Sequence, residues 1–286
     1  MDLKNIGESS NVEDTRGTSG GGGGRVLFGG GLGATVLALI VYFLGGDPSQ
    51  VLPQGDSSSG TASERGAPGQ RADDGTAQFV KKVLATTETV WDQLFMEKYR
   101  QQYQKPVLRI FDDGVQTECG SASAASGPFY CPADRKVYID LAFAEELKGR
   151  FNAPGDFALA YVVAHEVGHH VQNLLGISEK VQRMMQQGSQ EDANALSVRL
   201  ELQADFLAGI WAHYTQQMKG VIEPGDIQEA LGAAAAVGDD NIQEMTQGSV
   251  HPESFTHGSS EQRMYWFKRG YQSGDIDQGD TFSGSL

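Results

Sequence analysis

The sequence predicts an α+β protein, in which a mostly helical domain with a small β-sheet follows a single transmembrane helix. Apolar residues recur at helical spacing over residues 79–103 and again over residues 190–219. Between residues 107 and 143 the apolar period changes toward two, which is typical of strands. Residues 26–46 carry no charge and are long enough to cross a bilayer as a helix.

The composition is that of a globular protein with extensions. Of 286 residues, 39% are hydrophobic and 21% are charged, which allows one substantial core. The 22 basic residues stand against 37 acidic ones, so the net charge is −15. This balance disfavours nucleic acid and anionic lipid surfaces as partners. We therefore expect one folded domain and no nucleic acid partner.

The first 25 residues are expected to form a disordered cytoplasmic tail, because they are rich in Gly, Ser, Asn and acidic side chains. Arg16 and Arg25 precede the apolar stretch 26–46, and only Arg65 follows it closely, which places the tail in the cytoplasm. A cleaved signal peptide and a soluble core helix are the alternatives for the apolar stretch. Its length and its glycines favour an uncleaved transmembrane helix over both.

Composition also sets the later boundaries. Residues 47–78 contain Pro, Gly, Ser, Thr and Asp with almost no large apolar side chains, which predicts a flexible linker. The folded domain is expected over residues 79–273, and residues 274–286 are expected to be a polar, frayed tail. Further helices are expected from Ser178, over residues 190–219, over residues 227–245 and over residues 258–271.

The sheet is expected from three β-rich segments, at residues 107–111, 127–131 and 136–141, of which the last two are joined by a hairpin turn. The two cysteines of the chain, Cys119 and Cys131, lie on either side of a Gly/Ser/Ala loop. An even number of cysteines in an exported domain favours a disulfide between them. The alternative is a pair of free buried thiols in a cytosolic protein.

One helix carries the chemically most informative motif, His165-Glu166-x-x-His169. Histidines four residues apart project from one helical face, about 6 Å apart along the axis, so both rings can bind one metal ion. Glu166 projects to the edge of that face, which suits a general base acting on a metal-bound water. Two histidines that merely face solvent or the core are the alternative. The preceding apolar run, residues 157–164, disfavours it, because buried ionisable groups need a compensating ligand.

A catalytic zinc takes three protein ligands and keeps one position open, so a third ligand is required. Glu201 is the best candidate, because it lies on the apolar helix 190–219, which can pack against the first helix. Asp205 follows one turn later and would accept the outer N–H of a zinc-bound histidine. The alternative is that both carboxylates face solvent. Weaker candidates for the third ligand are Glu179, His213, His251 and His257.

Several segments resemble the bacterial family of neutral zinc metallopeptidases, and the likeness covers nearly the whole chain. They are Ser9–Asp14 with the glycine run that follows, Cys119-Gly120, Gly127–Pro132 and Ala160–Gln172. The resemblance implies a zincin-like peptidase domain, one Zn²⁺ per chain and a peptide or protein substrate.

Two more segments are similar to a wider group of membrane-associated zinc peptidases. Glu201-x-x-Ala-Asp205 matches a motif whose glutamate is the third zinc ligand, which implies that role for Glu201 and a supporting one for Asp205. The segment from His257 to Arg263 is similar to a His-Pro-x-x-x-x-Arg motif, with Gly258 where proline is common. It implies that His257 contacts the substrate or the transition state.

These observations predict a zinc metalloendopeptidase anchored in the bacterial inner membrane, with its catalytic domain on the periplasmic side. Zinc is held by His165, His169 and Glu201, and Glu166 is the general base. An alternative is a zinc-stabilised envelope protein that binds partners without cleaving them, for which Glu166 would be dispensable. An interaction module without metal is disfavoured by the buried ionisable groups. Candidates for the donor to the oxyanion are His257, His213, Tyr130 and Tyr161.

Overall fold

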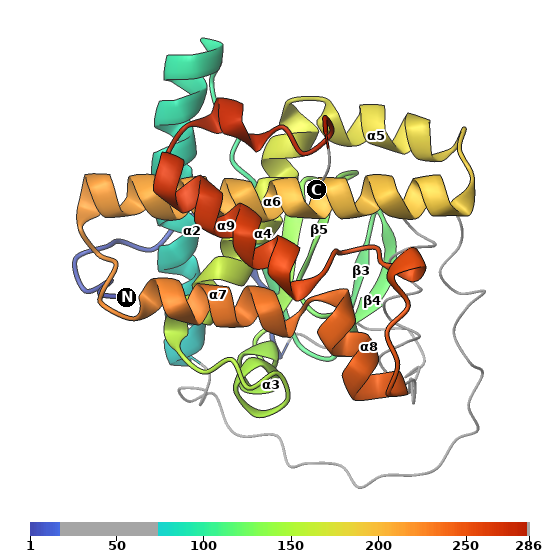
Figure 1. Ribbon diagram of the computed structural model, residues 1–286. Coiled ribbons are helices and arrows are strands. Elements are labelled where there is room, and N and C mark those ends of the chain that lie inside the picture. Colours follow the sequence, from blue (N-terminus) through green and yellow to red (C-terminus); the bar gives the residue numbers. More distant parts are fainter. Residues whose placement is uncertain (18–73, 285–286) are drawn as a thin grey trace, which may run out of the picture.

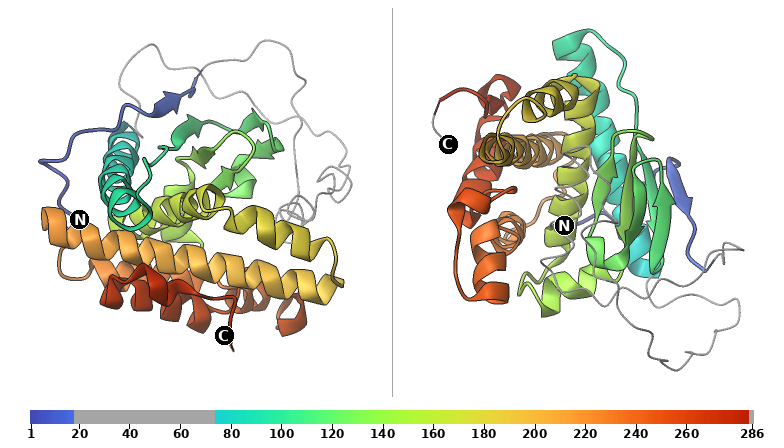
Figure 2. Two further views of the ribbon diagram at one scale, coloured as in Figure 1. Left: turned by 90° about the horizontal axis from the view of Figure 1, so that it is seen from above. Right: turned by 90° about the vertical axis from the view of Figure 1, so that its right-hand side faces the viewer.

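In the computed structural model, which describes residues 1–17 and 74–284, one long helix lies between a small sheet and a second long helix (Figures 1 and 2). These two helices are α4 (Asp156–Leu174) and α6 (Gln190–Lys219). The predicted α+β class, mostly helical with a small sheet, is confirmed for the described residues. The other α-helices of this part of the chain are α2 (Asp74–Leu94), α3 (Phe143–Gly149), α5 (Ile177–Met185), α7 (Asp226–Ala236), α8 (Asp239–Gln247) and α9 (Ser260–Ser273).

The larger sheet has four strands in the order β1-β2-β6-β5. Strand β2 is parallel to both of its neighbours, β1 and β6, whereas β5 is antiparallel to β6. The three predicted strands and the hairpin turn are confirmed, although the first strand of the hairpin begins two residues late. In the right-hand view of Figure 2, the helices lie on one side of the sheet. The strands are β1 (Val12–Asp14), β2 (Val107–Phe111), β5 (Phe129–Cys131) and β6 (Lys136–Asp140).

The two faces of this sheet pack against different partners. Alternate side chains of β2 and β6 point toward α4 and join the main core, as expected for period-two alternation. Phe111 and Tyr138, which are next to these residues in the sequence, point the other way and pack with Cys131 in a smaller core. Because one face of α4 meets the sheet and the other meets α6, the helix is apolar all round, and residues 157–172 are all buried.

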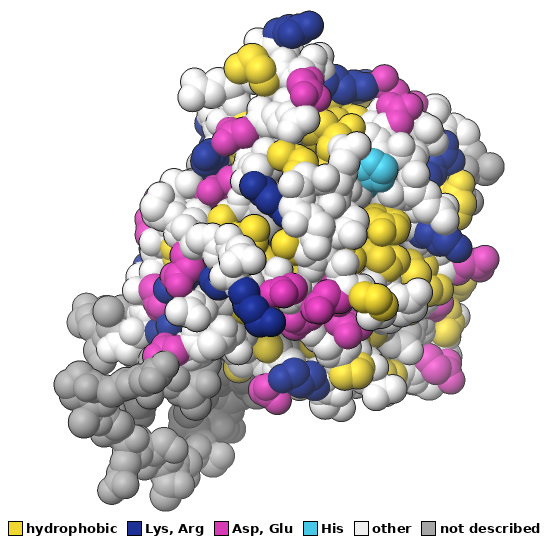
Figure 3. Space-filling view, turned by 90° about the vertical axis from the view of Figure 1, so that its left-hand side faces the viewer, with side chains coloured by type: hydrophobic (Ala, Val, Ile, Leu, Met, Phe, Trp, Pro, Cys, Tyr) yellow, Lys and Arg dark blue, Asp and Glu magenta, His cyan; other side chains and the backbone are white. Residues whose placement is uncertain are grey.

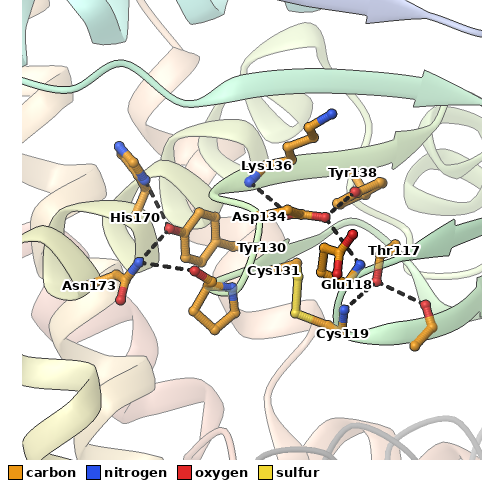
Figure 4. Close-up of a disulfide and its surroundings, with 12 residues drawn as sticks. Thr117, Glu118, Cys119, Tyr130, Cys131, Asp134, Lys136, Tyr138, His170 and Asn173 are labelled. Carbon is orange, nitrogen blue, oxygen red and sulfur yellow. Dashed lines mark hydrogen bonds between the residues drawn. A yellow bond between two sulfur atoms is a disulfide. The ribbon is translucent and has the colours of Figure 1, made fainter.

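The smaller core is covered by a second hairpin, made of β3 (Gly114–Thr117) and β4 (Gly120–Ser123), which the sequence did not predict. Cys119 lies in the turn of this hairpin and forms a disulfide with Cys131 of β5, with their Cα atoms 5.9 Å apart (Figure 4). The predicted disulfide is therefore confirmed. It joins the hairpin to β5, a strand of the main sheet that contacts α4.

Two predicted boundaries are wrong. Helix α2 begins at Asp74, so residues 74–78 belong to its first turns and not to a flexible linker. The single helix expected over residues 227–245 is two helices, α7 and α8. The second begins at Asp239, whose carboxylate accepts backbone N–H groups from the loop before α9 and so fixes the direction of the chain there.

The N-terminal segment, residues 1–17, is part of the folded domain. Its strand β1 extends the sheet by pairing with β2, and the side chains of Met1 and Leu3 are buried in the main core. The predicted disordered tail over residues 1–25 is therefore wrong for residues 1–17. The average composition of the segment is polar, although it contains a few buried apolar side chains. Its strand has only three residues, which is too short to show an alternation of apolar and polar side chains.

The α-ammonium group of Met1 lies among three carboxylates. It is 3.1 Å from Asp156 at the start of α4, 3.1 Å from Asp226 at the start of α7 and 3.2 Å from Glu223. Figure 3 shows acidic side chains gathered on this face of the molecule. Burial opposes the charged ammonium, but the three carboxylates outweigh it and raise its pKa from 8.0 to about 10.

This site predicts a loss of stability at alkaline pH. Because the pKa is raised in the folded state, the stabilisation is complete below about pH 8 and is lost as the pH rises through about 10. Urea unfolding between pH 7 and pH 10.5 measures the effect, with an N-terminally acetylated chain as the control. The acetylated chain should lack this component of the pH dependence, and identical pH profiles for the two chains would contradict the prediction.

Residues 274–284 are also part of the folded domain. The hydroxyl of Thr281 donates a hydrogen bond of 2.6 Å to the carbonyl of Arg199, and the side chain of Gln203 donates one of 2.9 Å to the carbonyl of Gly279. Residues 274–284 thus pack against α6, and the expectation of a frayed tail is wrong for them.

The predicted transmembrane helix, residues 26–46, lies outside the described residues. Among the helices of residues 1–17 and 74–284, none combines the length and the apolar character needed to cross a membrane.

Candidate metal centre

Two histidines of α4 and one glutamate of α6 come together between the two helices. The Nε2 atom of His165 lies 3.2 Å from one carboxylate oxygen of Glu201, and the Nε2 atom of His169 lies 3.4 Å from the other. One potential ligand atom of each residue lies within 4.8 Å of the others. The structure therefore brings together the three residues that the sequence predicted as ligands.

The donor set fits a zinc ion. Two imidazoles and a carboxylate are a known catalytic combination that leaves a fourth position open. All three residues are buried, and a carboxylate buried between imidazoles needs a cation to offset its lost hydration. Within the described residues, the other group with similarly close ligand atoms is Asp156, Asp226 and Glu229, which has no histidine.

Glu166 lies next to the first histidine on α4 and is 8% exposed. Burial raises the pKa of its carboxyl group, because the charged form loses hydration, and the nearby histidines only partly oppose this. A carboxylate with a raised pKa binds a proton more readily, which suits a general base.

Asp205 holds the first histidine in place. Its Oδ1 atom accepts a hydrogen bond of 2.8 Å from Nδ1 of His165, which leaves Nε2 of that ring free to bind a metal. Arg263 of α9 donates to both oxygens of Asp205, at 2.8 and 3.0 Å, and Tyr161 donates to Oδ1 at 2.5 Å. Burial alone would raise the pKa of Asp205, but Arg263 and His165 lower it to about 2.

The second histidine is held by a chain of side-chain amides that the sequence did not predict. Nδ1 of His169 donates a hydrogen bond of 2.9 Å to Oε1 of Gln172, one turn further along α4. The amide nitrogen of Gln172 donates in turn to the carbonyl of Leu200 and to Oε1 of Gln203 on α6. The spacing of three residues between His169 and Gln172 would have placed both on one helical face.

His257 lies on the loop before α9, near enough to Glu201 for each charge to affect the pKa of the other. The carboxylate of Asp239 holds this loop: one oxygen accepts the backbone N–H groups of residues 256–258, and the other lies 3.3 Å from Nδ1 of His257. Gly258 has a φ of +90°, which proline cannot adopt, so the glycine at this place follows from the backbone.

Three of the weaker candidates for the third ligand, Glu179, His213 and His251, lie away from the site. Glu179 is exposed on α5 and pairs with Arg183, and His251 is exposed beside Glu253. The ring of His213 donates to the carbonyl of Tyr271. None of these three residues belongs to the group of converging ligand atoms.

Two of the candidate oxyanion donors are already engaged. The hydroxyl of Tyr161 donates to Asp205, as described above. The hydroxyl of Tyr130 donates to Nδ1 of His170 at 3.0 Å and accepts a hydrogen bond from Asn173 (Figure 4). Burial lowers the pKa of His170 to about 4, so its ring is neutral and supports the helix rather than the metal centre. Of the other two candidates, His213 lies outside the group of converging ligand atoms, whereas His257 lies near Glu201.

The close approach of α4 and α6 depends on Gly168, which lies between the candidate ligands His165 and His169. A Cβ atom at this position would lie 2.9 Å from the backbone oxygen of Ala204. Gly168→Ala is therefore expected to lower the free energy of unfolding by about 1–3 kcal/mol and to weaken zinc binding. Urea unfolding and zinc titration measure this. Gly232→Ala on the exposed side of α7, where a Cβ meets nothing within 4 Å, should be neutral or stabilising.

The fold and the site define a class of protein in which one helix supplies two histidines and a glutamate, and a second helix supplies a buried carboxylate. The chain belongs to the family described as "Putative neutral zinc metallopeptidase", whose model matches residues 1–282. It is a zinc-dependent peptidase at the level of that family, and Zn²⁺ is the cofactor that the family implies.

The chain is similar to curated proteins from two groups of bacteria. It is 48% identical over 284 residues to "Uncharacterized protein YpfJ" of Escherichia coli (strain K12), which covers 98% of each chain. It is 48% identical over 215 residues to "Uncharacterized protein Rv2575" of Mycobacterium tuberculosis (strain H37Rv), which covers 71% of this chain and 70% of the other. No solved structure matches it.

Proposed function

We propose that this protein is a zinc metalloendopeptidase in which His165, His169 and Glu201 hold the metal and Glu166 is the general base. The observation that carries the proposal is the convergence of the two Nε2 atoms and the carboxylate between α4 and α6. The buried carboxyl of Glu166 on the same helix supports it, because a general base must lie beside the metal without being a ligand.

Bound at this site, zinc would act as a Lewis acid that polarises the scissile carbonyl and lowers the pKa of a water molecule. Glu166 accepts a proton from the attacking water and passes it to the leaving amine nitrogen. Asp205 keeps the proton of His165 on Nδ1, and Gln172 does the same for His169, so each ring presents Nε2. His257 would donate a hydrogen bond to the oxyanion of the tetrahedral intermediate.

We also infer that the catalytic domain works outside the cytoplasm. Structural disulfides form and persist in oxidising compartments, and the Cys119–Cys131 disulfide supports such a location. An association with the bacterial inner membrane through residues 26–46 is a prediction from the absence of charge in that stretch.

The test is to purify the full chain in detergent, measure zinc per chain and follow the hydrolysis of casein. One zinc per chain, with cleavage that a chelator abolishes and added zinc restores, is the expected result. One zinc without cleavage of casein or of a peptide library would favour the alternative, a zinc-stabilised envelope protein that binds partners. A chain that binds no zinc would overturn the proposal.

A further inference from the structure

The N-terminal segment, residues 1–17, is attached to the catalytic domain at several independent points. Asn11 accepts the backbone N–H of Leu108 on β2, and Thr15 donates its own to the carbonyl of Ile110. Nearer the start, the backbone of Asp2 donates to the carbonyl of Val221, beyond the end of α6. These contacts run from the sheet edge to the helical layer, so the segment is part of the domain along its whole length.

Polar side chains of the segment also satisfy a buried group of the domain. The hydroxyl of Ser9 and the amide of Asn11 both donate hydrogen bonds of 2.7 Å to one carboxylate oxygen of Glu88 on α2. Glu88 is only 8% exposed, and without these donors its carboxylate would be left with fewer partners in a largely apolar region. The domain is therefore incomplete without the segment.

The described residues on either side of residues 18–73 lie next to each other. The guanidinium group of Arg16, at the end of the segment, lies 3.5 Å from the carboxylate of Asp74, the first residue of α2. The same guanidinium pairs with Asp14 at 2.6 Å, and its side chain is 5% exposed. The two ends of residues 18–73 are thus held next to each other on one face of the domain.

We propose that the N-terminal segment and the catalytic domain lie on the same side of the membrane. Two ends that meet on one side of a bilayer cannot be joined by a chain that crosses it once. The apolar stretch 26–46 could supply one crossing, but residues 47–73 contain Asp, Glu and Arg and no second apolar stretch long enough to return. The predicted single crossing, with a cytoplasmic tail and a periplasmic domain, is incompatible with this arrangement.

The first experiment determines on which side of the membrane the N-terminal segment and the catalytic domain lie, in cells that express the full chain. Single cysteines replace two exposed residues, Glu8→Cys in the segment and Gln187→Cys in the domain, and intact cells are treated with a membrane-impermeant maleimide. The unsubstituted chain measures any background from Cys119 and Cys131. We expect the two positions to be labelled together, or protected together until the cells are permeabilised.

The labelling pattern tests the common side of the membrane separately from the proposed location outside the cytoplasm. Labelling of both positions in intact cells supports both inferences. Labelling of both only after permeabilisation supports the common side but overturns the location outside the cytoplasm. Labelling of one position in intact cells and of the other only after permeabilisation would overturn the common side.

A second experiment tests the pairing itself in isolated membranes. Glu13 and Arg109 are partners in the β1–β2 register, and their side chains lie 3.5 Å apart. The double variant Glu13→Cys/Arg109→Cys should form an intramolecular disulfide on mild oxidation, detected by mass spectrometry of the linked peptides. Glu13→Cys/Gln187→Cys is the matched control that should not link. An unlinked Glu13/Arg109 pair in membranes, with the native Cys119–Cys131 disulfide intact, would contradict the proposal.

Discussion

Glu166→Gln is expected to slow peptide hydrolysis by about 10²- to 10⁴-fold while zinc content stays at the wild-type level. Glutamine has nearly the same shape as glutamate, so the packing around this buried side chain of α4 should be kept. It cannot accept a proton at neutral pH, so the proposed general base is removed and the proposed ligands His165, His169 and Glu201 remain. Initial rates on labelled casein and zinc by atomic absorption measure the two properties on the same sample.

Glu244→Gln, an exposed substitution of the same kind on α8, is the matched control and should leave both properties unchanged. Full activity of Glu166→Gln would show that another group takes the proton. A loss of zinc in Glu166→Gln would instead make Glu166 a metal ligand, and the open position assigned to water would then be filled by the protein.

Breaking the buried pair of Asp205 and Arg263 is expected to give the largest loss of stability. Asp205→Asn leaves the guanidinium of Arg263, which is 4% exposed, without its charged partner, and this should cost about 3–5 kcal/mol of unfolding free energy. The same change weakens the orientation of His165, so zinc affinity should fall by about 10- to 100-fold. Urea unfolding and competitive zinc titration measure these two effects.

A double-mutant cycle separates the ion pair from the other contacts of Asp205. Arg263→Met alone should also be strongly destabilising, because it leaves a buried carboxylate, whereas Asp205→Asn/Arg263→Met should cost less than the sum of the two. Additive losses would mean that the two charges contribute independently. Lys268→Met, in the same helix as Arg263, serves as a control for the change of charge.

The parts of the site that follow from local spacing could be predicted from the sequence. The spacing of four residues from His165 to His169 places both rings on one face of any α-helix, whatever the rest of the chain does. Glu201 could be found because a carboxylate in an apolar helix needs a reason to be buried. The disulfide was predictable because the chain has only two cysteines to pair.

The parts that depend on distant segments could not be predicted in this way. Asp239 fixes the loop that carries His257, but nothing in its neighbourhood distinguishes it from any other aspartate near the start of a helix. Strand β1 has only three residues, and it becomes a strand because β2 offers an open edge for pairing. The average composition of residues 1–25 therefore did not predict that residues 1–17 are folded, because a few contacts decide whether a short polar segment is ordered.

The hydrogen bonds behind the metal ligands also bear on how the protein is made. Arg263, which completes the support of His165, and Gly279, which anchors Gln203 and through it Gln172, both follow the histidines by about a hundred residues. A ribosome therefore adds the two histidines well before the groups that orient them. The hydrogen bonds that hold His165 and His169 can form only once the chain has been synthesised beyond Gly279, so a shorter growing chain lacks the oriented pair of imidazoles.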